Sequence, residues 1–395
     1  MTGPRRVLQV HNDHQEKGGA LEVLQHEGEL LAGHGHQVEQ FILPATADLG
    51  LSPVRAGLKA VWNLEASAEL ARRITRFRPD VVHVHTPFPL LSPAVFRTAA
   101  KLGVPSLTTL HSFRYSCVAA TCFRDGGICE DCVGKRLKLP GVRHRCYHDS
   151  LAASGALTLS LALHRGIGTF HRSVTRFITL TGFSRRLLIR DGIPAEKVIV
   201  KANSVPDPGP PSGPDTASPY VAFAGRLLDV KGVRTLLDAW PQVGGGTRLR
   251  IAGDGPLREL VQERARTEES IEYLGWVDEE AVTALMAGAA AVVVPSEWYE
   301  GLPLVILRSL SVGTPLVVSD LENISEELLA DHAGAAFAVG DPIALARVLR
   351  GLLADPDRLL GMRRAARASY QLRYSPAVNL AALENIYAAV VRTAE

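Results

Sequence analysis

Two cations follow a predicted strand in the second half of the chain. Residues 220–224 form a short apolar run typical of a buried strand, and the segment after it contains Gly225, Arg226 and Lys231. A glycine at the end of a strand lets the chain turn and lets a ligand approach the backbone. Two cations beside a helix N-terminus favour the binding of a diphosphate ligand. The alternative is an ordinary strand-to-helix turn whose charges are solvated.

Two further turns follow other predicted strands of the same half. The turn 253–256 contains Gly255 and enters a helix, and the loop 296–301 places Glu300 where another helix begins. The free N–H groups at such a helix start can meet the oxygens of a polar ligand. A carboxylate beside them can hold a sugar hydroxyl. The alternative is that Glu300 only stabilises the helix dipole.

The first half carries two weaker signals. Gly18 and Gly19 follow the apolar run 7–10 but lack the full dinucleotide-binding pattern. His111 closes the run 106–111, where its ring could donate a hydrogen bond or act on an acceptor hydroxyl. The alternative for His111 is a packing or surface role, which most of the 13 histidines must have.

Short apolar runs alternate with helical segments and must position these residues. The runs are nearly continuous in apolar character, as expected for parallel strands that helices cover on both faces. We therefore predict an α/β fold with two Rossmann-like, doubly wound parallel-sheet domains and an interdomain cleft. The predicted strands are 7–10, 38–43, 81–85, 106–111, 176–180 and 197–202 in the first half, and 220–224, 248–252, 271–274, 289–294, 315–319 and 335–339 in the second.

Length and composition fit this organisation. The 395 residues exceed one usual domain, and the segment 204–219 contains six prolines and two glycines, which predicts a linker between domains 1–203 and 220–375. Apolar residues make up 46% of the chain, which excludes a largely disordered protein. The formal charge of +2 argues against a strong grip on nucleic acid. No leader-like or membrane-spanning run is evident, so we expect a cytoplasmic protein.

All five cysteines fall in one short stretch, with the spacing C-x4-C-x6-C-x2-C-x13-C. Cys129 and Cys132 resemble half of a tetrahedral zinc site, which Cys146 with Cys117 or Cys122 could complete. The alternative is a group of free thiols. The same stretch is basic and could face an anionic acceptor or an acidic membrane surface, or be a solvated face; its cations are Arg114, Arg124, Lys135, Arg136, Lys138, Arg143 and Arg145.

Four motifs taken in order resemble the retaining nucleotide-sugar glycosyltransferases of family 4, which have the GT-B fold. They are GRLLDVKG at 225–232, GDGP at 253–256, YLGWV at 273–277 and SEWYEGLPLVIL at 296–307. The resemblance implies transfer of a sugar from a nucleoside diphosphate to a hydroxyl acceptor by front-face substitution, with no cofactor required. It also implies a final helix, 376–395, that crosses back to the first domain. A subgroup of the family is similar in carrying a cysteine-bearing insertion, here 112–149.

The resemblance also implies residue roles. Arg226 and Lys231 would bind the diphosphate, and Glu300 and His111 would contact the transferred sugar; these four are the catalytic candidates. The backbone around 275–277 would contact the nucleobase. The expected donor-binding residues are Gly18, Gly19, Gly225, Gly255, Trp276, Val277, Gly301, Leu302, Pro303 and Arg308.

Arg308 departs from the family pattern, which has a second glutamate at this position to hold the ribose hydroxyls. A guanidinium donates hydrogen bonds and accepts none. We expect it about two turns into the helix after Glu300. The alternatives to an ordinary donor are therefore a phosphorylated donor that Arg308 binds, or a binding role without catalysis. Another possibility is that Arg308 points to solvent and Glu297 supplies the carboxylate.

Overall fold

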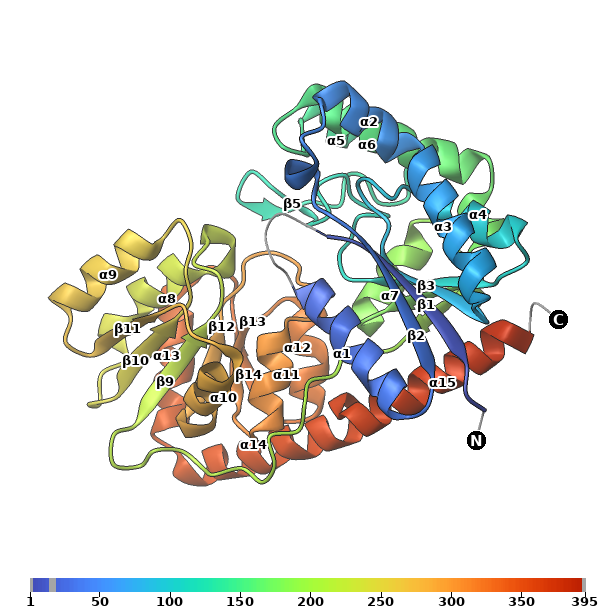
Figure 1. Cartoon of the computed structure of the whole chain (residues 1–395). Helices are drawn as coiled ribbons and strands as arrows, with labels where there is room; N and C mark the ends of the chain where they lie inside the picture. Colours follow the sequence, from blue (N-terminus) through green and yellow to red (C-terminus); the bar gives the residue numbers. More distant parts are fainter. Residues whose placement is uncertain (1–2, 14–18, 393–395) are drawn as a thin grey trace. The chain divides into compact units, whose positions relative to one another are not determined.

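The computed structural model describes residues 3–13 and 19–392 (Figure 1). The chain divides into two compact units. The N-terminal unit comprises Met1–Asn203 together with Asn379–Glu395, and the C-terminal unit comprises Ser204–Val378.

The N-terminal unit is built on a six-stranded parallel sheet in the order β2-β1-β3-β4-β7-β8. Its strands are β1 (Arg6–Asn12), β2 (Gln37–Leu43), β3 (Val81–Thr86), β4 (Ser106–Leu110), β7 (Arg176–Thr179) and β8 (Val198–Val200). Its helices are α1 (Gly19–Gly33), α2 (Pro53–Val61), α3 (Leu64–Phe77), α4 (Ala94–Lys101), α5 (Leu139–Arg143), α6 (Leu151–Gly166) and α7 (Gly182–Arg190), and most of α15 (Pro376–Arg392) also belongs to this unit.

Alternate residues of the strands serve the two faces of this sheet. Leu8 and Val82 pack into the larger core, whereas Val7 and Val81 pack against Leu383 of α15. Both sets are fully buried because helices cover both faces, which explains the continuous apolar runs in the sequence. His83 and His85 share the face of Val81, since side chains two apart in a strand point the same way.

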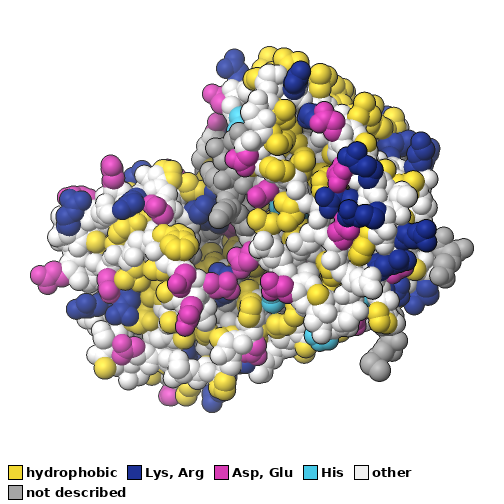
Figure 2. All heavy atoms as spheres, viewed as in Figure 1, with side chains coloured by type: hydrophobic (Ala, Val, Ile, Leu, Met, Phe, Trp, Pro, Cys, Tyr) yellow, Lys and Arg dark blue, Asp and Glu magenta, His cyan; other side chains and the backbone are white. Residues whose placement is uncertain are grey.

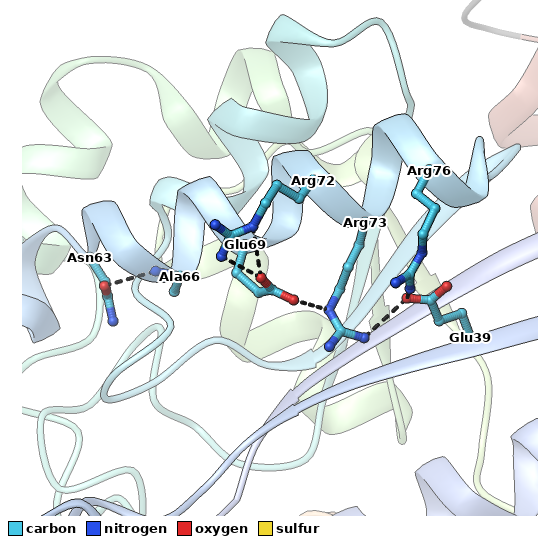
Figure 3. Close-up of polar contacts among 7 residues, drawn as sticks. All are labelled: Glu39, Asn63, Ala66, Glu69, Arg72, Arg73 and Arg76. Atoms are coloured by element: carbon cyan, nitrogen blue, oxygen red, sulfur yellow. Dashed lines mark hydrogen bonds and ion pairs between the residues drawn. The ribbon is translucent and has the colours of Figure 1, made fainter.

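The helix α3 shows how local sequence fixes an element of this unit. The buried Asn63 caps it by accepting a hydrogen bond from the N–H of Ala66 at 3.0 Å. The outer face carries a chain of ion pairs that ends on Glu39 of β2, and Figure 3 shows these side chains turned toward one another. The chain consists of Glu69, Arg72, Arg73, Arg76 and Glu39. Such surface pairs contribute only about 0–1 kcal/mol each.

Asn63→Ala is expected to lower the free energy of unfolding by about 1–3 kcal/mol, because the variant loses the cap of α3 and leaves a buried carbonyl unpaired. That carbonyl belongs to Leu90 and accepts from Asn63 Nδ2 at 2.6 Å. Ser52 is the matched control, since it caps α2 at an exposed site with a longer contact of 3.4 Å. Urea denaturation of both alanine variants measures the difference. Equal losses would contradict the role of the Leu90 contact.

The C-terminal unit contains a second six-stranded parallel sheet, in the order β11-β10-β9-β12-β13-β14. Its strands are β9 (Tyr220–Ala224), β10 (Arg248–Ala252), β11 (Ile271–Gly275), β12 (Ala291–Val294), β13 (Leu316–Ser319) and β14 (Gly334–Phe337). Its helices are α8 (Val233–Ala239), α9 (Arg258–Thr267), α10 (Glu279–Gly288), α11 (Leu304–Ser311), α12 (Glu322–Ala330), α13 (Pro342–Leu353) and α14 (Pro356–Ser369). The strand order reverses at β9, which is where open α/β sheets bind ligands.

The predicted fold class is confirmed, because all twelve predicted strands are present and they form two doubly wound parallel sheets. Some boundaries differ. β8 spans only Val198–Val200, and β12 begins at Ala291. The proline-rich segment 204–219 contains no helix or strand. Among the described residues, no helix is both long and apolar enough to cross a bilayer.

Candidate active site

Four loops at the carboxyl edge of the second sheet are joined by backbone hydrogen bonds. The loops after β9 and β10 are linked by the N–H of Leu227, which donates to the carbonyl of Asp254 at 2.9 Å. The N–H of Gly253 donates to the carbonyl of Gly275 after β11 at 2.7 Å, and the N–H of Glu297 after β12 donates to the carbonyl of Val230 at 2.9 Å. The motif loops therefore form one continuous edge.

Two glycines of these motifs are required by the packing of one loop on another. Gly253 has a φ of 140°, and a Cβ there would lie 1.8 Å from the carbonyl oxygen of Gly225. Gly232 has a φ of 69°, and a Cβ there would lie 1.8 Å from the carbonyl oxygen of Pro295. Both positions exclude every larger residue. Some glycines of these motifs are therefore required by the packing of the loops, whether or not a ligand approaches them.

Lys231 and Glu300, separated by 69 residues in sequence, form an ion pair with 2.5 Å between Nζ and Oε1. The same carboxylate oxygen accepts from Ser296 Oγ at 2.8 Å and from Trp298 Nε1 at 2.9 Å. Asn323 Nδ2 donates to the Glu300 carbonyl at 2.6 Å. Glu300 is almost buried, so its side chain is held before any ligand arrives. The structure thus brings together Lys231, which was predicted to bind phosphate, and Glu300, which was predicted to bind the sugar.

The other predicted donor-binding residues lie along the same edge. Arg226 is exposed in the β9 loop next to Gly225, and Gly255 lies in the β10 loop. Trp276 is 75% exposed after β11, with Val277 half-buried beside it. The half-buried residues Gly301, Leu302 and Pro303 lead into α11, with Pro303 as its cap residue.

Arg308 lies in the second turn of α11, nearer the helix start than expected, because α11 begins only at Leu304. Its Nη2 pairs with Oε1 of Glu279 on α10 at 3.0 Å, and its side chain is 15% exposed. Arg308 therefore does not point to solvent. Glu297, the suggested substitute carboxylate, instead accepts from Thr235 Oγ1 at 2.7 Å. The sequence did not single out Glu279.

The N-terminal unit places His111 in a buried histidine cluster that sequence reasoning missed. His111 Nε2 lies 3.1 Å from His85 Nδ1, and His85 Nε2 lies 3.5 Å from Oε2 of Glu27. Glu27 also pairs with the buried Lys201. His83 adds contacts of 2.8 Å to both Tyr387 of α15 and Thr109 of β4. The signal in the sequence was the alternation of His83 and His85 with valines along one strand.

Burial keeps the histidines of this cluster neutral. Desolvation lowers the pKa of His111 to about 3 and those of His83 and His85 well below their usual value. Burial is the largest single effect and would raise the pKa of Glu27, but the interactions with Lys201, His83 and His111 together lower it, so Glu27 is a carboxylate. His85 Nε2 and Glu27 Oε2 lie 3.5 Å apart, and neither atom has a hydrogen-bond partner within the part of the chain that the structure describes. Of His85 Nδ1 and His111 Nε2, one donates and the other accepts, so the tautomers of the two rings are coupled.

His85 and His111 also line a pocket of about 200 Å³ within the N-terminal unit. Its other walls are largely aromatic and apolar and include Phe88, Tyr115 and Tyr147. A cavity of this kind, with a few polar groups among apolar walls, is typical of a small-ligand subsite. Gly19 begins α1 in the same unit, and Gly18 lies outside the described residues.

Among the described residues, one group offers three potential metal ligands within 4.8 Å, namely Glu27, His83 and His85. Both nitrogens of His83 are already hydrogen-bonded, and the ammonium of Lys201 neutralises Glu27. A cation would therefore compete with a lysine for Glu27 and displace one of the two hydrogen bonds of His83. These residues fit a hydrogen-bond network better than a metal centre.

The predicted zinc ligands Cys117, Cys129, Cys132 and Cys146 do not converge in the structure. All five cysteines are described, and no three of their sulfurs form a group within 4.8 Å. Cys117 instead interacts with Cys122, and a hydrogen bond from that thiol is the main cause that lowers the pKa of Cys117 to about 6. The zinc site is therefore not supported by the geometry.

Buried charges anchor the cysteine-bearing segment in place of a metal. Lys138 is fully buried, pairs with Asp191 and donates to the carbonyl of Cys132 at 2.8 Å. Asp191 also pairs with Arg165 and accepts from the N–H of Gly134 at 2.8 Å. The spacing of the cysteines could not reveal this arrangement, because Asp191 and Arg165 lie outside the segment.

Comparison with known proteins gives relatives along most of the chain. Residues 18–204 match the glycosyl transferase 4-like domain, and residues 218–355 match the glycosyl transferases group 1 family. A glycogen synthase from Mycobacterium tuberculosis is 28% identical over 74% of this chain, which spans only 64% of that enzyme's length. A GDP-mannose-dependent phosphatidylinositol dimannoside mannosyltransferase from the same species is 36% identical over 37% of this chain and 38% of its own length.

Solved structures agree at the level of the fold. HepE from Anabaena, crystallised with UDP and glucose, aligns over 97% of this chain and 99% of its own, with a TM-score of 0.65 and 18% identity. A sucrose-phosphate synthase from Thermosynechococcus elongatus aligns over 98% and 100%, with a TM-score of 0.70 and 16% identity. The two family matches together cover more than half of the residues. The chain therefore belongs to the group 1 glycosyltransferases of family 4, and its fold is GT-B.

Proposed function

We propose that the protein is a retaining glycosyltransferase that moves a sugar from a nucleoside diphosphate to a hydroxyl acceptor. The observation that carries the proposal is the pair of Lys231 and Glu300 at the edge where the strand order reverses. It offers a cation for phosphate and a fixed carboxylate for sugar hydroxyls in one place. The names of the relatives support the proposal, because they include a glycogen synthase and mannosyltransferases.

In this proposal Arg226 and Lys231 bind the diphosphate as it leaves. The bond between the sugar carbon and the phosphate oxygen breaks, and the acceptor oxygen bonds to the same face of that carbon. The acceptor proton passes to the departing phosphate oxygen. Electrostatic stabilisation of that oxygen by two cations is the main catalytic contribution, and no metal is required for it.

Glu300 and His111 orient the sugar in this scheme. Glu300 Oε1 is occupied by Lys231, Ser296 and Trp298, which fixes the plane of the carboxylate for a sugar hydroxyl. The neutral His111 forms a hydrogen bond with a sugar hydroxyl through Nδ1, and its tautomer sets which of the two donates. The segment 220–375 would hold the donor, residues 1–203 the acceptor, and 204–219 would serve as the linker between them.

The experiment that tests this function is incubation with UDP-, GDP- and ADP-sugars and simple hydroxyl acceptors. Release of nucleoside diphosphate and the anomeric configuration of the product, followed by NMR, are the readouts. Retained configuration supports the proposal, and inverted configuration contradicts it. Binding of the nucleotides without turnover of any sugar would favour a purely binding role.

The second candidate function is one in which Arg308 holds the phosphate of the donor. In the function proposed above, Arg308 only pairs with Glu279, so Arg308→Gln is expected to change the Kd for UDP or GDP by less than about threefold. A guanidinium that binds phosphate contributes a charged hydrogen bond, and its loss would weaken binding roughly tenfold or more. Isothermal titration calorimetry separates the two outcomes.

A further inference from the structure

Two helices of the N-terminal unit present large apolar side chains to solvent. Val54 and Leu58 on α2 are 73% and 66% exposed, and Leu151 and Leu159 on α6 are 58% and 57% exposed. We call these four side chains the apolar face. Figure 2 shows hydrophobic side chains gathered over α2, at the top of the view. Exposed leucines that occur singly need no explanation, but a group on adjacent helices marks a surface that meets something apolar.

The composition of α6 is unusual for a surface helix. Residues 151–163 contain no charged side chain. Leu157 and Leu161 fill the core, so the inner side of α6 is already accounted for. A helix at the surface of a protein normally carries charged residues on its outer side. The outer leucines of α6 therefore add nothing to the core and leave the outer side of the helix apolar.

The two helices are fixed to each other. His164 near the end of α6 contacts the carbonyl of Val61 at the end of α2, at 3.0 Å from Nε2. Gly57 lies against Ala156, where an added Cβ would be 3.6 Å from the alanine methyl. The apolar face is thus one surface that spans both helices.

Cations border this face almost without acidic partners. Asp149 is the one acidic residue among residues 135–163, and α2 contains none. The segment around α5, which packs on α6, also exposes Leu137 and Leu139 among its cations. The exposed cations are Arg55, Lys135, Arg136, Arg143 and Arg145.

We propose that the apolar face docks the protein on a membrane surface that contains anionic lipids. Leucine and valine side chains would enter the boundary between headgroups and acyl chains, and the surrounding cations would meet lipid phosphates. The charge pattern favours this occupant over a second copy of the chain, which would bring the same cations together. The proposal does not depend on the glycosyltransferase activity.

The test is flotation of the full chain with lipid vesicles. We expect binding to vesicles of equimolar phosphatidylglycerol and phosphatidylcholine, and weaker binding at high salt or to pure phosphatidylcholine. Leu58→Gln combined with Leu159→Gln is expected to lower the partition coefficient by at least about tenfold, because two apolar side chains no longer enter the lipid. Arg136→Gln combined with Arg143→Gln is expected to remove the preference for the anionic vesicles.

Leu360→Gln combined with Leu372→Gln is the matched control, since both leucines are exposed in the C-terminal unit. This control should bind vesicles like the unchanged protein. Circular dichroism checks that each variant is folded. The proposal is overturned if the unchanged protein does not float, or if the control loses as much binding as Leu58→Gln with Leu159→Gln. It is also overturned if sedimentation velocity shows a dimer that this pair disrupts while vesicles are not bound.

Discussion

Lys231→Ala is expected to lower turnover of the nucleotide sugar by roughly 100-fold or more, the effect of removing one electrostatic contact to a developing charge. The fold should persist, because Lys231 is the last residue of a one-turn 3₁₀ helix at the sheet edge and Glu300 keeps its hydrogen bonds from Ser296 and Trp298. Loss of the cation should therefore affect the departing diphosphate far more than the stability of the protein. Steady-state kinetics with the best donor from the nucleotide-sugar panel measures the effect.

Arg234 provides the matched control for Lys231. It is a cation near the same loop, and its Nε pairs with Asp229 at 2.6 Å on the exposed surface. Arg234→Ala should leave turnover within about twofold of the unchanged enzyme, since an exposed ion pair contributes little. Near-normal transfer by Lys231→Ala combined with Arg226→Ala would contradict the assignment of the diphosphate site. Thermal unfolding of each variant separates lost chemistry from a lost fold.

Asp191→Ala is expected to cost about 3–5 kcal/mol of stability, because it leaves the fully buried ammonium of Lys138 without its counter-ion. Arg165 and the N–H of Gly134 lose the same partner. Asp131→Ala is the control, since that carboxylate pairs with Arg124 at the surface of the same segment. Urea denaturation should show a large loss for Asp191→Ala and at most about 1 kcal/mol for Asp131→Ala.

A second variant keeps this prediction testable if Asp191→Ala does not fold. Lys138→Met combined with Asp191→Leu removes the fully buried ion pair and should recover much of the stability, as apolar replacements of buried ion pairs often do. Arg165 loses its counter-ion in this variant but is partly exposed and keeps its hydrogen bonds to the backbone carbonyls of residues 115 and 191. Treatment with a metal chelator should leave the unfolding midpoint unchanged. A chelator-sensitive midpoint together with bound zinc would show that thiols, and not Asp191, hold this segment.

The fold was predictable because its determinants are local. Apolar runs such as 220–224 and 291–294 predict buried parallel strands. The proline-rich segment 204–219 predicts an interruption of the strand and helix pattern. The positions of the motif loops follow from the same rule, since all carboxyl ends of parallel strands meet at one edge.

The contacts inside the candidate site depend on the tertiary structure and were not predictable in the same way. Lys231 meets Glu300 across 69 residues, and His83 meets Tyr387 across 304 residues. Arg308 finds Glu279 on a different helix, so its departure from the family pattern could not be interpreted from its position alone. The cysteine spacing was misleading for a related reason. Spacing along the chain is compatible with several arrangements of thiols, and the buried pair of Lys138 and Asp191 anchors the segment through a residue that lies outside it.

The N-terminal unit is built from two segments that are far apart in the sequence, and this affects the order in which the two units can fold during synthesis. This unit contains the strands that precede the C-terminal unit in the sequence and also the segment Asn379–Glu395, which follows that unit. Until α15 emerges, the sheet face of Val7, Val81 and Leu107 lacks the part of its cover that Leu383 and its neighbours on α15 provide, and His83 has no tyrosine partner. The C-terminal unit, by contrast, is continuous and can fold as soon as its own residues are available. Of these two units, the one whose synthesis begins first is therefore the one that is completed last.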